Sequence, residues 1–223
     1  MKNILVLEMI NNGEIEELKA LLQNEIYTDS LKGNGDSKKR YKAMERYIKA
    51  ATNWTQPNNA MMHEPCKVTV HGEEYYCFID GYNIALTTES IGQIPEYDNS
   101  KDTYFKVDKM ITFDGTMEKL NLNSILAEEK SKGYKWKKSE LGDNGNFQYL
   151  FKYKDGYFKI GLLDMAYSIV NDGEEAEVYY INNKAPITIK TSVGIALVLP
   201  INASEDIEKN HVVVDVEKNQ KAA

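Results

Sequence analysis

The order of predicted elements occurs twice in this chain, and this repeat constrains the fold more than any other feature. Residues 37–54, "SKKRYKAMERYIKAATNW", have the apolar periodicity of a helix, and three short strands follow them. Residues 162–170, "LLDMAYSIV", also predict a helix that three strands follow. The two halves share this order but little sequence. Two copies of a helix and a three-stranded meander predict an α+β fold, with two antiparallel sheets side by side and two helices on one face.

Turn-forming residues separate the predicted strands. In "CKVTVHGEEYYCFIDGYNIALTTE" we expect turns at Gly72-Glu73 and at Asp80-Gly81. "TYFKVDKMITFDG" predicts one or two more strands, "LNLNSILAEEKSKG" predicts a helix, and a hairpin of "FQYLFKY" and "YFKIG" is expected to turn at Asp155-Gly156. The final hairpin, "KAPITIKTSVGIALVLPI", runs apolar into Pro200-Ile201. We expect this ending to finish a sheet rather than to line a pocket.

The repeat defines a domain over residues 37–201, with one segment on either side. Residues 1–36 form an N-terminal helical extension in this interpretation, because Ile15, Leu18 and Leu22 recur at helical spacing within a helix predicted for residues 3–27. Residues 202–223 form a polar C-terminal tail, in which "HVVVDV" either adds an edge strand or stays loose.

Composition and charge limit the function. Hydrophobic residues make up 42% and charged residues 27% of the 223 positions, which is ordinary for a soluble globular protein. The formal charge of −7 disfavours nucleic-acid binding by the whole surface but allows a local basic face. No apolar run is long enough to cross a membrane, and "MKNILVLEMI" lacks the pattern of a signal peptide. With two cysteines and no export signal, we expect a cytoplasmic protein with reduced thiols.

The helix predicted for residues 37–54 has a basic side opposite an apolar side. The apolar side holds Tyr41, Met44, Ile48 and Ala51. The opposite side holds four cations, which are Lys39, Lys42, Arg46 and Lys49. These cations either contact the phosphates of a nucleic acid, with an affinity that falls with salt, or form an ordinary solvated helix face.

A second basic segment, "KSKGYKWKK" at residues 130–138, places five lysines around Tyr134 and Trp136. Aromatic rings among cations suit single-stranded nucleic acid, because bases stack on the rings while the cations attract the phosphates. The alternative is a loop after a helix, from which Trp136 returns to the core.

Four residues have spacings reminiscent of a zinc site: His63, Cys66, His71 and Cys77. The predicted hairpin argues against such a site. A turn at Gly72-Glu73 pairs Val68 with Cys77 and Cys66 with Ile79. Both cysteines then share one face of the sheet, while His71 points to the other. Ligands on opposite faces cannot converge on one ion, so we expect core cysteines and no metal site.

The sequence holds no recognisable catalytic constellation. It lacks a G-x-S-x-G motif and a phosphate-binding glycine loop, and its three histidines have no evident partner that would orient them as bases. We therefore expect a protein without enzymatic activity and without a cofactor.

The C-terminal part of the domain resembles the last domain of bacterial DNA sliding clamps, the processivity factors of DNA polymerases. The likeness lies in an aromatic-rich strand, the helix "LLDMAYSI", the strands "EAEVYYI" and "APITI", and the ending "ALVLPI". The residues at matching places are Leu163, Asp164, Ala166 and Pro200. "FIDGYNIAL" resembles a turn of the same fold. The likeness covers residues 145–201 best and residues 37–90 less well, and it implies a DNA-clamp-like arrangement of the pseudo-repeat.

Two features depart from that family. Clamp rings contain several such domains, whereas this chain accounts for one. The helices of a clamp line its central hole and face DNA, but residues 162–170 carry Asp164 and neither lysine nor arginine.

The whole chain also resembles proteins carried by phages and mobile elements of Gram-positive bacteria, through segments such as "GEIEELKALLQNEIY" and "YFKIGLLDMAYSIVNDGEEAEVY". Together the likenesses imply a non-enzymatic accessory protein that contacts DNA through the basic side of residues 37–54. The alternative is a protein-interaction module, a decoy or inhibitor of a host factor, that has lost the DNA role. The expected partner is DNA or a replication-associated host protein, and the oligomeric state is left open.

Overall fold

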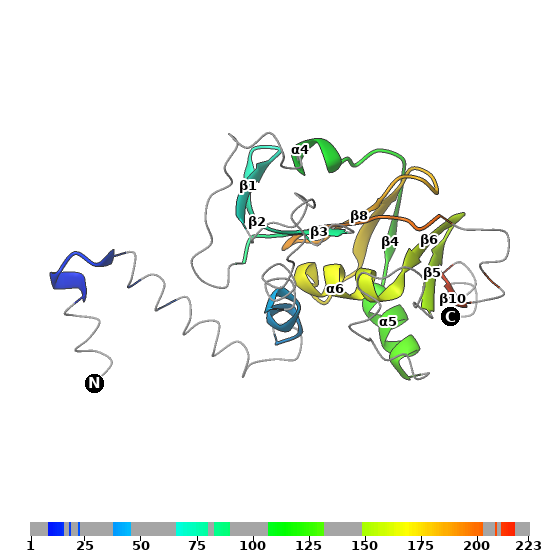
Figure 1. Ribbon diagram of the computed structural model, residues 1–223, viewed down its shortest axis with the longest axis horizontal. Coiled ribbons are helices and arrows are strands. Elements are labelled where there is room, and N and C mark those ends of the chain that lie inside the picture. Colours follow the sequence, from blue (N-terminus) through cyan, green and yellow to red (C-terminus); the bar gives the residue numbers. More distant parts are fainter. Residues whose placement is uncertain are drawn as a thin grey trace, which may run out of the picture.

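The computed structural model describes residues 9–15, 18, 22, 38–45, 66–79, 83–89, 107–131, 149–202, 208 and 211–216. Its strands are β1 (Cys66–Val70), β2 (Glu73–Ile79), β3 (Asn83–Thr87), β4 (Thr116–Leu120), β5 (Tyr149–Tyr153), β6 (Gly156–Lys159), β7 (Ala176–Tyr180), β8 (Ile187–Lys190), β9 (Gly194–Val198) and β10 (Val212–Asp215). Its labelled helices are α4 (Val107–Met110), α5 (Leu122–Ser131) and α6 (Ile160–Val170) (Figure 1). Residues 38–45 form a further helical segment.

The two meanders of the repeat are joined into one sheet. The seven-stranded sheet has the order β1-β2-β3-β9-β8-β7-β4, and the last strands of the two meanders, β3 and β9, pair antiparallel. The order is therefore symmetric about the β3–β9 pair, with β4 added beyond β7. The α+β class and the repeat of helix and meander are confirmed, and the two meanders form one continuous sheet.

Helix α6 and the helix at residues 38–45 lie on the same face of this sheet, which we call the inner face (Figure 1). α6 packs against β3 and β9, where Ala85 lies opposite Ala196 and both small side chains join the inner core. Every residue of α6 except Ser168 is buried. The second sheet and α5 contribute side chains such as Phe158 and Leu122 to this core. A helix that is apolar all round is an interior helix, and α6 is one.

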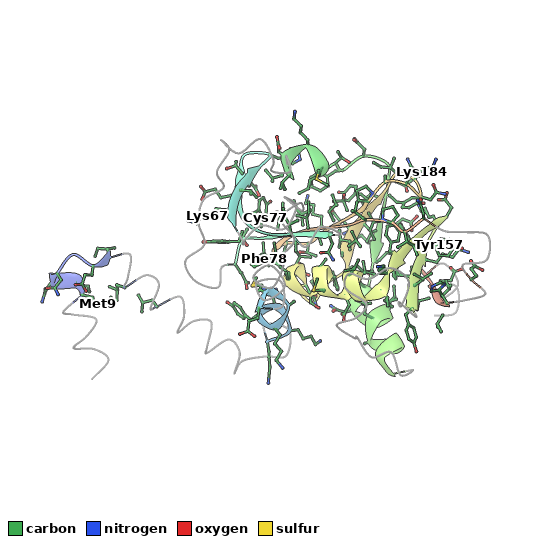
Figure 2. All side chains as sticks on the ribbon, viewed as in Figure 1. Met9, Lys67, Cys77, Phe78, Tyr157 and Lys184 are labelled. Carbon is green, nitrogen blue, oxygen red and sulfur yellow. The ribbon has the colours of Figure 1, made fainter. Side chains whose placement is uncertain are left out.

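The opposite, outer face of the sheet is partly covered by residues 107–113. Adjacent residues of a strand point to opposite faces, so Phe78 joins the inner core whereas Cys77 joins an outer cluster under α4 (Figure 2). The prediction of strands in this region is wrong for α4. Val107 and Ile111 are one helical repeat apart, both are buried, and the Ile111 N–H donates to the Val107 carbonyl at 3.2 Å.

A second sheet has the order β10-β5-β6, and β10 pairs parallel with β5. "HVVVDV" of the predicted tail therefore supplies an edge strand, and Val214 and Val216 are buried in the inner core. The chain reaches this sheet through the Pro-Ile ending of the final hairpin. The Ile201 N–H donates to the Tyr157 carbonyl of β6 at 2.8 Å, so the ending extends the hydrogen bonding of a sheet.

The turn between β1 and β2 lies one residue earlier than predicted. It is formed by His71 and Gly72, with φ of 51° and 86°. Two positive φ values give the turn the twist of the flanking strands, and glycine adopts such a φ without strain. Cys66 consequently lies opposite Cys77, not opposite Ile79. Moving the turn by one residue changes each residue's partner on the other strand by two positions. A change of two positions leaves every side chain on its predicted face.

The turn between β5 and β6 is also one residue early. It is formed by Lys154 and Asp155, and Lys154 has a φ of 53°. In both hairpins, a prediction based only on the preference of turns for glycine chose the wrong pair of turn residues. Pairing across the whole hairpin decides between neighbouring registers.

The predicted helix over residues 3–27 is interrupted. Residues 9–11 and 15 are helical, but a turn at residues 12–13, with a φ of 76° at Gly13, separates them. Leu18 is buried, whereas Ile15 and Leu22 are exposed. The remaining residues of the predicted extension lie outside the described ranges. No helix in the described part of the chain is both long and apolar enough to span a membrane.

Candidate nucleic-acid interface

The described part of the basic helix, residues 38–45, has an exposed side and a buried side. Lys38, Lys39 and Lys42 are exposed, whereas Tyr41 and Met44 are buried in the inner core. At 3.6 residues per turn the three lysines fall within an arc of about 100°. The predicted separation into two sides thus holds over these positions, and Lys38 joins the predicted stripe. Arg46 and Lys49, the other members of that stripe, lie outside the described residues.

Arg40 anchors this helix to the rest of the domain. Its side chain is buried, forms an ion pair with Glu89 just after β3, and donates a hydrogen bond to the carbonyl of Asn171 at the end of α6. The carboxyl end of a helix carries partial negative charge, so a cation is stabilised there. The sequence prediction missed this residue, although an arginine within the apolar arc of the helix was a visible signal.

Asn171 also connects α6 to α5. Its side-chain amide exchanges two hydrogen bonds with that of Asn123, at 2.9 and 2.7 Å, and its Oδ1 accepts from the Gly173 N–H at 2.8 Å. One residue thus holds the ends of α6 and α5 together while its carbonyl accepts from Arg40. The exposed lysines therefore project from a helix that the buried Arg40 joins to the end of α6.

The next residue, Asp172, fixes the turn before β9. Its Oδ2 accepts hydrogen bonds from the Ser192 N–H at 2.9 Å and from the Ser192 hydroxyl at 2.7 Å. Burial alone would raise the pKa of the Asp172 carboxyl, but these bonds and one from the Glu174 N–H hold that pKa below its ordinary value. Asp172 is therefore ionised at neutral pH and holds the tip of the β8–β9 hairpin against the end of α6.

The two helices of the repeat differ in what they present to solvent. Residues 38–45 expose three lysines, whereas the one charged residue of α6, Asp164, is buried. The side of α6 that faces away from the sheet is covered by other elements of the inner core. Among the described residues of these two helices, only those at 38–45 therefore present cations to solvent.

The remaining candidates from the sequence lie partly outside the described residues, and those that are described do not form a site. Residues 132–138 of the lysine-rich segment, and His63, lie outside the described ranges. His71 contacts the ring of Phe113 at 5.8 Å, and Cys77 is buried in the outer cluster. Among the described residues, no three potential ligands are grouped so that they could hold a metal ion.

No protein-family model and no curated protein matches the chain. Among solved structures, the chain is similar to a protein of Eubacterium rectale provisionally assigned as a DNA polymerase III beta subunit, at 19% identity and a TM-score of 0.34. The match covers 60% of this chain and 43% of that protein, so this chain corresponds to less than half of it.

Proposed function

We propose that the chain is a non-enzymatic binding protein that contacts the phosphates of DNA through the exposed lysines of residues 38–45. The observation that carries this proposal is the anchoring of the helix by Arg40. The buried arginine holds one side against the ends of α6 and β3, and Lys38, Lys39 and Lys42 project from the other side. A row of cations on a fixed helix loses less conformational freedom on binding than the same cations on a flexible segment.

Such an interface has a defined signature in solution. Each phosphate contact releases counterions, so the logarithm of the affinity falls with the logarithm of the salt concentration by about 0.9 per contact. Binding of this kind is independent of sequence. Because the net charge of the chain is −7, we expect phosphate binding only at a local basic surface.

The test compares two double variants of equal charge change. Lys39→Glu/Lys42→Glu reverses two cations of the stripe, and Lys109→Glu/Lys184→Glu reverses two exposed lysines elsewhere. Affinity for a duplex of arbitrary sequence is measured over a series of salt concentrations. We expect the first variant to lower the salt slope by about two and to weaken binding on the order of 100-fold at low salt.

The second variant should bind DNA within a few-fold of the unmodified chain. The proposal fails if both variants bind alike, or if the first keeps the full salt slope. Melting temperatures of both variants should match that of the unmodified chain, because all four lysines are exposed.

The burial of α6 favours a second candidate function, a protein-interaction module. Of the two helices that begin the repeats, only residues 38–45 present cations among the described residues, so a surface with a broad basic face is not assembled there. A pull-down from host lysate tests it. A replication or defence protein that is retained at high salt, and is captured equally well by Lys39→Glu/Lys42→Glu, would support this function over DNA binding. Loss of the capture in that variant or at high salt would count against it.

A further inference from the structure

β4 is the last strand of the seven-stranded sheet, and within the described residues no strand pairs with its outer edge. Thr116, Met117 and Lys119 of this strand are exposed. An open edge presents unpaired main-chain N–H and C=O groups and can pair with a strand of another molecule. β4 contains no proline, the residue that commonly protects such an edge.

Apolar side chains adjoin this edge on the outer face. Met117 is 48% exposed and lies opposite Tyr179 in the β4–β7 register. The rings of Tyr179 and Phe113 are in tilted contact, with their centroids 5.1 Å apart, and Ile181, two residues beyond Tyr179, is 47% exposed. We call Phe113, Met117, Tyr179 and Ile181 the edge patch. Met117 and Ile181 are two large exposed apolar side chains beside the strand edge. Removing such side chains from water is favourable, so they mark a surface suited to contact with another molecule.

The charges of β4 select one way for two copies to pair. In an antiparallel pair related by a two-fold axis perpendicular to the sheet, one residue must lie opposite itself. Centring the pair on Glu118 or on Lys119 would place like charges opposite each other, which destabilises a sheet. Centring it on Thr116 would place Glu118 opposite Asp114. Centring it on Leu120 would place β4 opposite residues 121–124, which enter α5 and cannot continue a strand. Centring it on Met117 places an apolar, adaptable side chain opposite itself and avoids every like-charge pair.

That register also places a cation between the two copies. Lys154 Nζ lies 2.5 Å from Thr116 Oγ1 and 3.0 Å from Glu118 Oε1 on the inner face of its own chain. The hydrogen bond from Lys154 holds the pKa of Glu118 below its ordinary value, so Glu118 is ionised at neutral pH. With Met117 on the axis, Glu118 of the second copy lies opposite Thr116. Each ammonium, which has three donors, can then reach a carboxylate of both copies.

We propose that β4 is a self-association surface, at which two copies of this chain pair antiparallel about Met117 and extend one sheet into the other. The pairing covers Met117 from both copies, and it uses the main-chain groups of β4. The inference is independent of DNA binding, because the lysines of residues 38–45 lie on a different element.

The test uses complementary charges at the axis. The mass in solution is measured by light scattering over a concentration series, and the unmodified chain should reach twice its 25.4 kDa. Met117→Lys and Met117→Glu each place like charges opposite each other, and each should weaken dimerisation roughly ten-fold or more. An equimolar mixture of the two variants should recover the dimer, because the charges at the axis then attract.

The matched control is Val212, which is 44% exposed on β10 of the other sheet. Val212→Lys should dimerise as the unmodified chain does. The proposal is overturned if the unmodified chain stays monomeric, if Met117→Lys remains a dimer, or if the mixture does not associate. An equal loss of dimer in Val212→Lys would also overturn it. Unchanged far-ultraviolet circular dichroism spectra would confirm that the variants are folded, since both side chains are exposed in the single chain, and the melting temperature of a Met117 variant should fall only by what loss of the dimer removes.

Discussion

Replacement of Gly194 by alanine tests the junction of the two meanders. Gly194 begins β9 and lies opposite Thr87 of β3, at the centre of the seven-stranded sheet. A Cβ added here would lie far inside van der Waals distance of the Leu86 carbonyl oxygen and 2.9 Å from Val170 Cγ1. The nearest atom belongs to the main chain of a paired strand and cannot rotate away. The two strands must therefore separate, or α6 must shift.

The expected cost follows from this geometry. Overpacking of a core costs about 1–3 kcal/mol, and a clash with a main-chain atom places Gly194→Ala near the upper end, at about 3 kcal/mol. For a chain of 223 residues, this corresponds to a fall in melting temperature of roughly 6–12 °C. Adding Val170→Ala should recover none of the loss, because the Leu86 carbonyl remains in place.

Thermal and urea unfolding, followed by circular dichroism, measure the effect, and Gly173→Ala is the control. Gly173 has a φ of 93°, but no atom lies within 4 Å of a Cβ added there. Its cost is conformational and amounts to about 1–2 kcal/mol. If Gly194→Ala destabilises the chain no more than Gly173→Ala, then β3 and β9 are not paired in this register and the symmetric sheet is incorrect.

Two further predictions concern Asp172 and the C-terminal strand. Because the folded pKa of Asp172 is lowered, its contribution to stability is complete above the unfolded pKa and is lost as the pH falls through the folded value. Asp172→Asn should therefore lower the free energy of unfolding by about 1 kcal/mol at pH 7 and by progressively less below about pH 4, and a constant difference in urea unfolding across that range would contradict this. Truncation after Asn202 removes β10 with the buried Val214 and Val216, and it should cost roughly 3 kcal/mol or more. Truncation after Val216 keeps β10 and should leave the melting temperature nearly unchanged, and equal melting temperatures for the two truncations would refute a structural role for this strand.

Much of the fold could be predicted from local patterns. Apolar residues at helical spacing separated Tyr41 and Met44 from Lys39 and Lys42, and the structure buries and exposes them accordingly. Alternation along strands placed Cys77 with Val68, and it did so even with the turn misplaced, because an error of two residues preserves the face. Each of these features depends only on how often apolar residues recur along one helix or strand.

The candidate site was only partly predictable. The exposed lysines followed from the helical wheel, but the role of Arg40 did not, because its partners Glu89 and Asn171 are far from it in sequence. Likewise, a short segment with an apolar residue at each end, such as Val107–Met110, is compatible with a strand or with a helical turn, and only its position over the outer face decides between them.

The sequence by itself determined the class of the fold, the order of its elements outside residues 103–115 and the buried side of most of them, because each depends on spacing within a short segment. The tertiary structure alone decided that the two meanders share one sheet, that α6 is interior on every side, and that the C-terminal strand completes the second sheet. It also decided that, within the described part of the chain, β4 is the last strand of the sheet. Each of these depends on which distant segment supplies the neighbouring surface, and periodicity shows that a face is covered without showing what covers it.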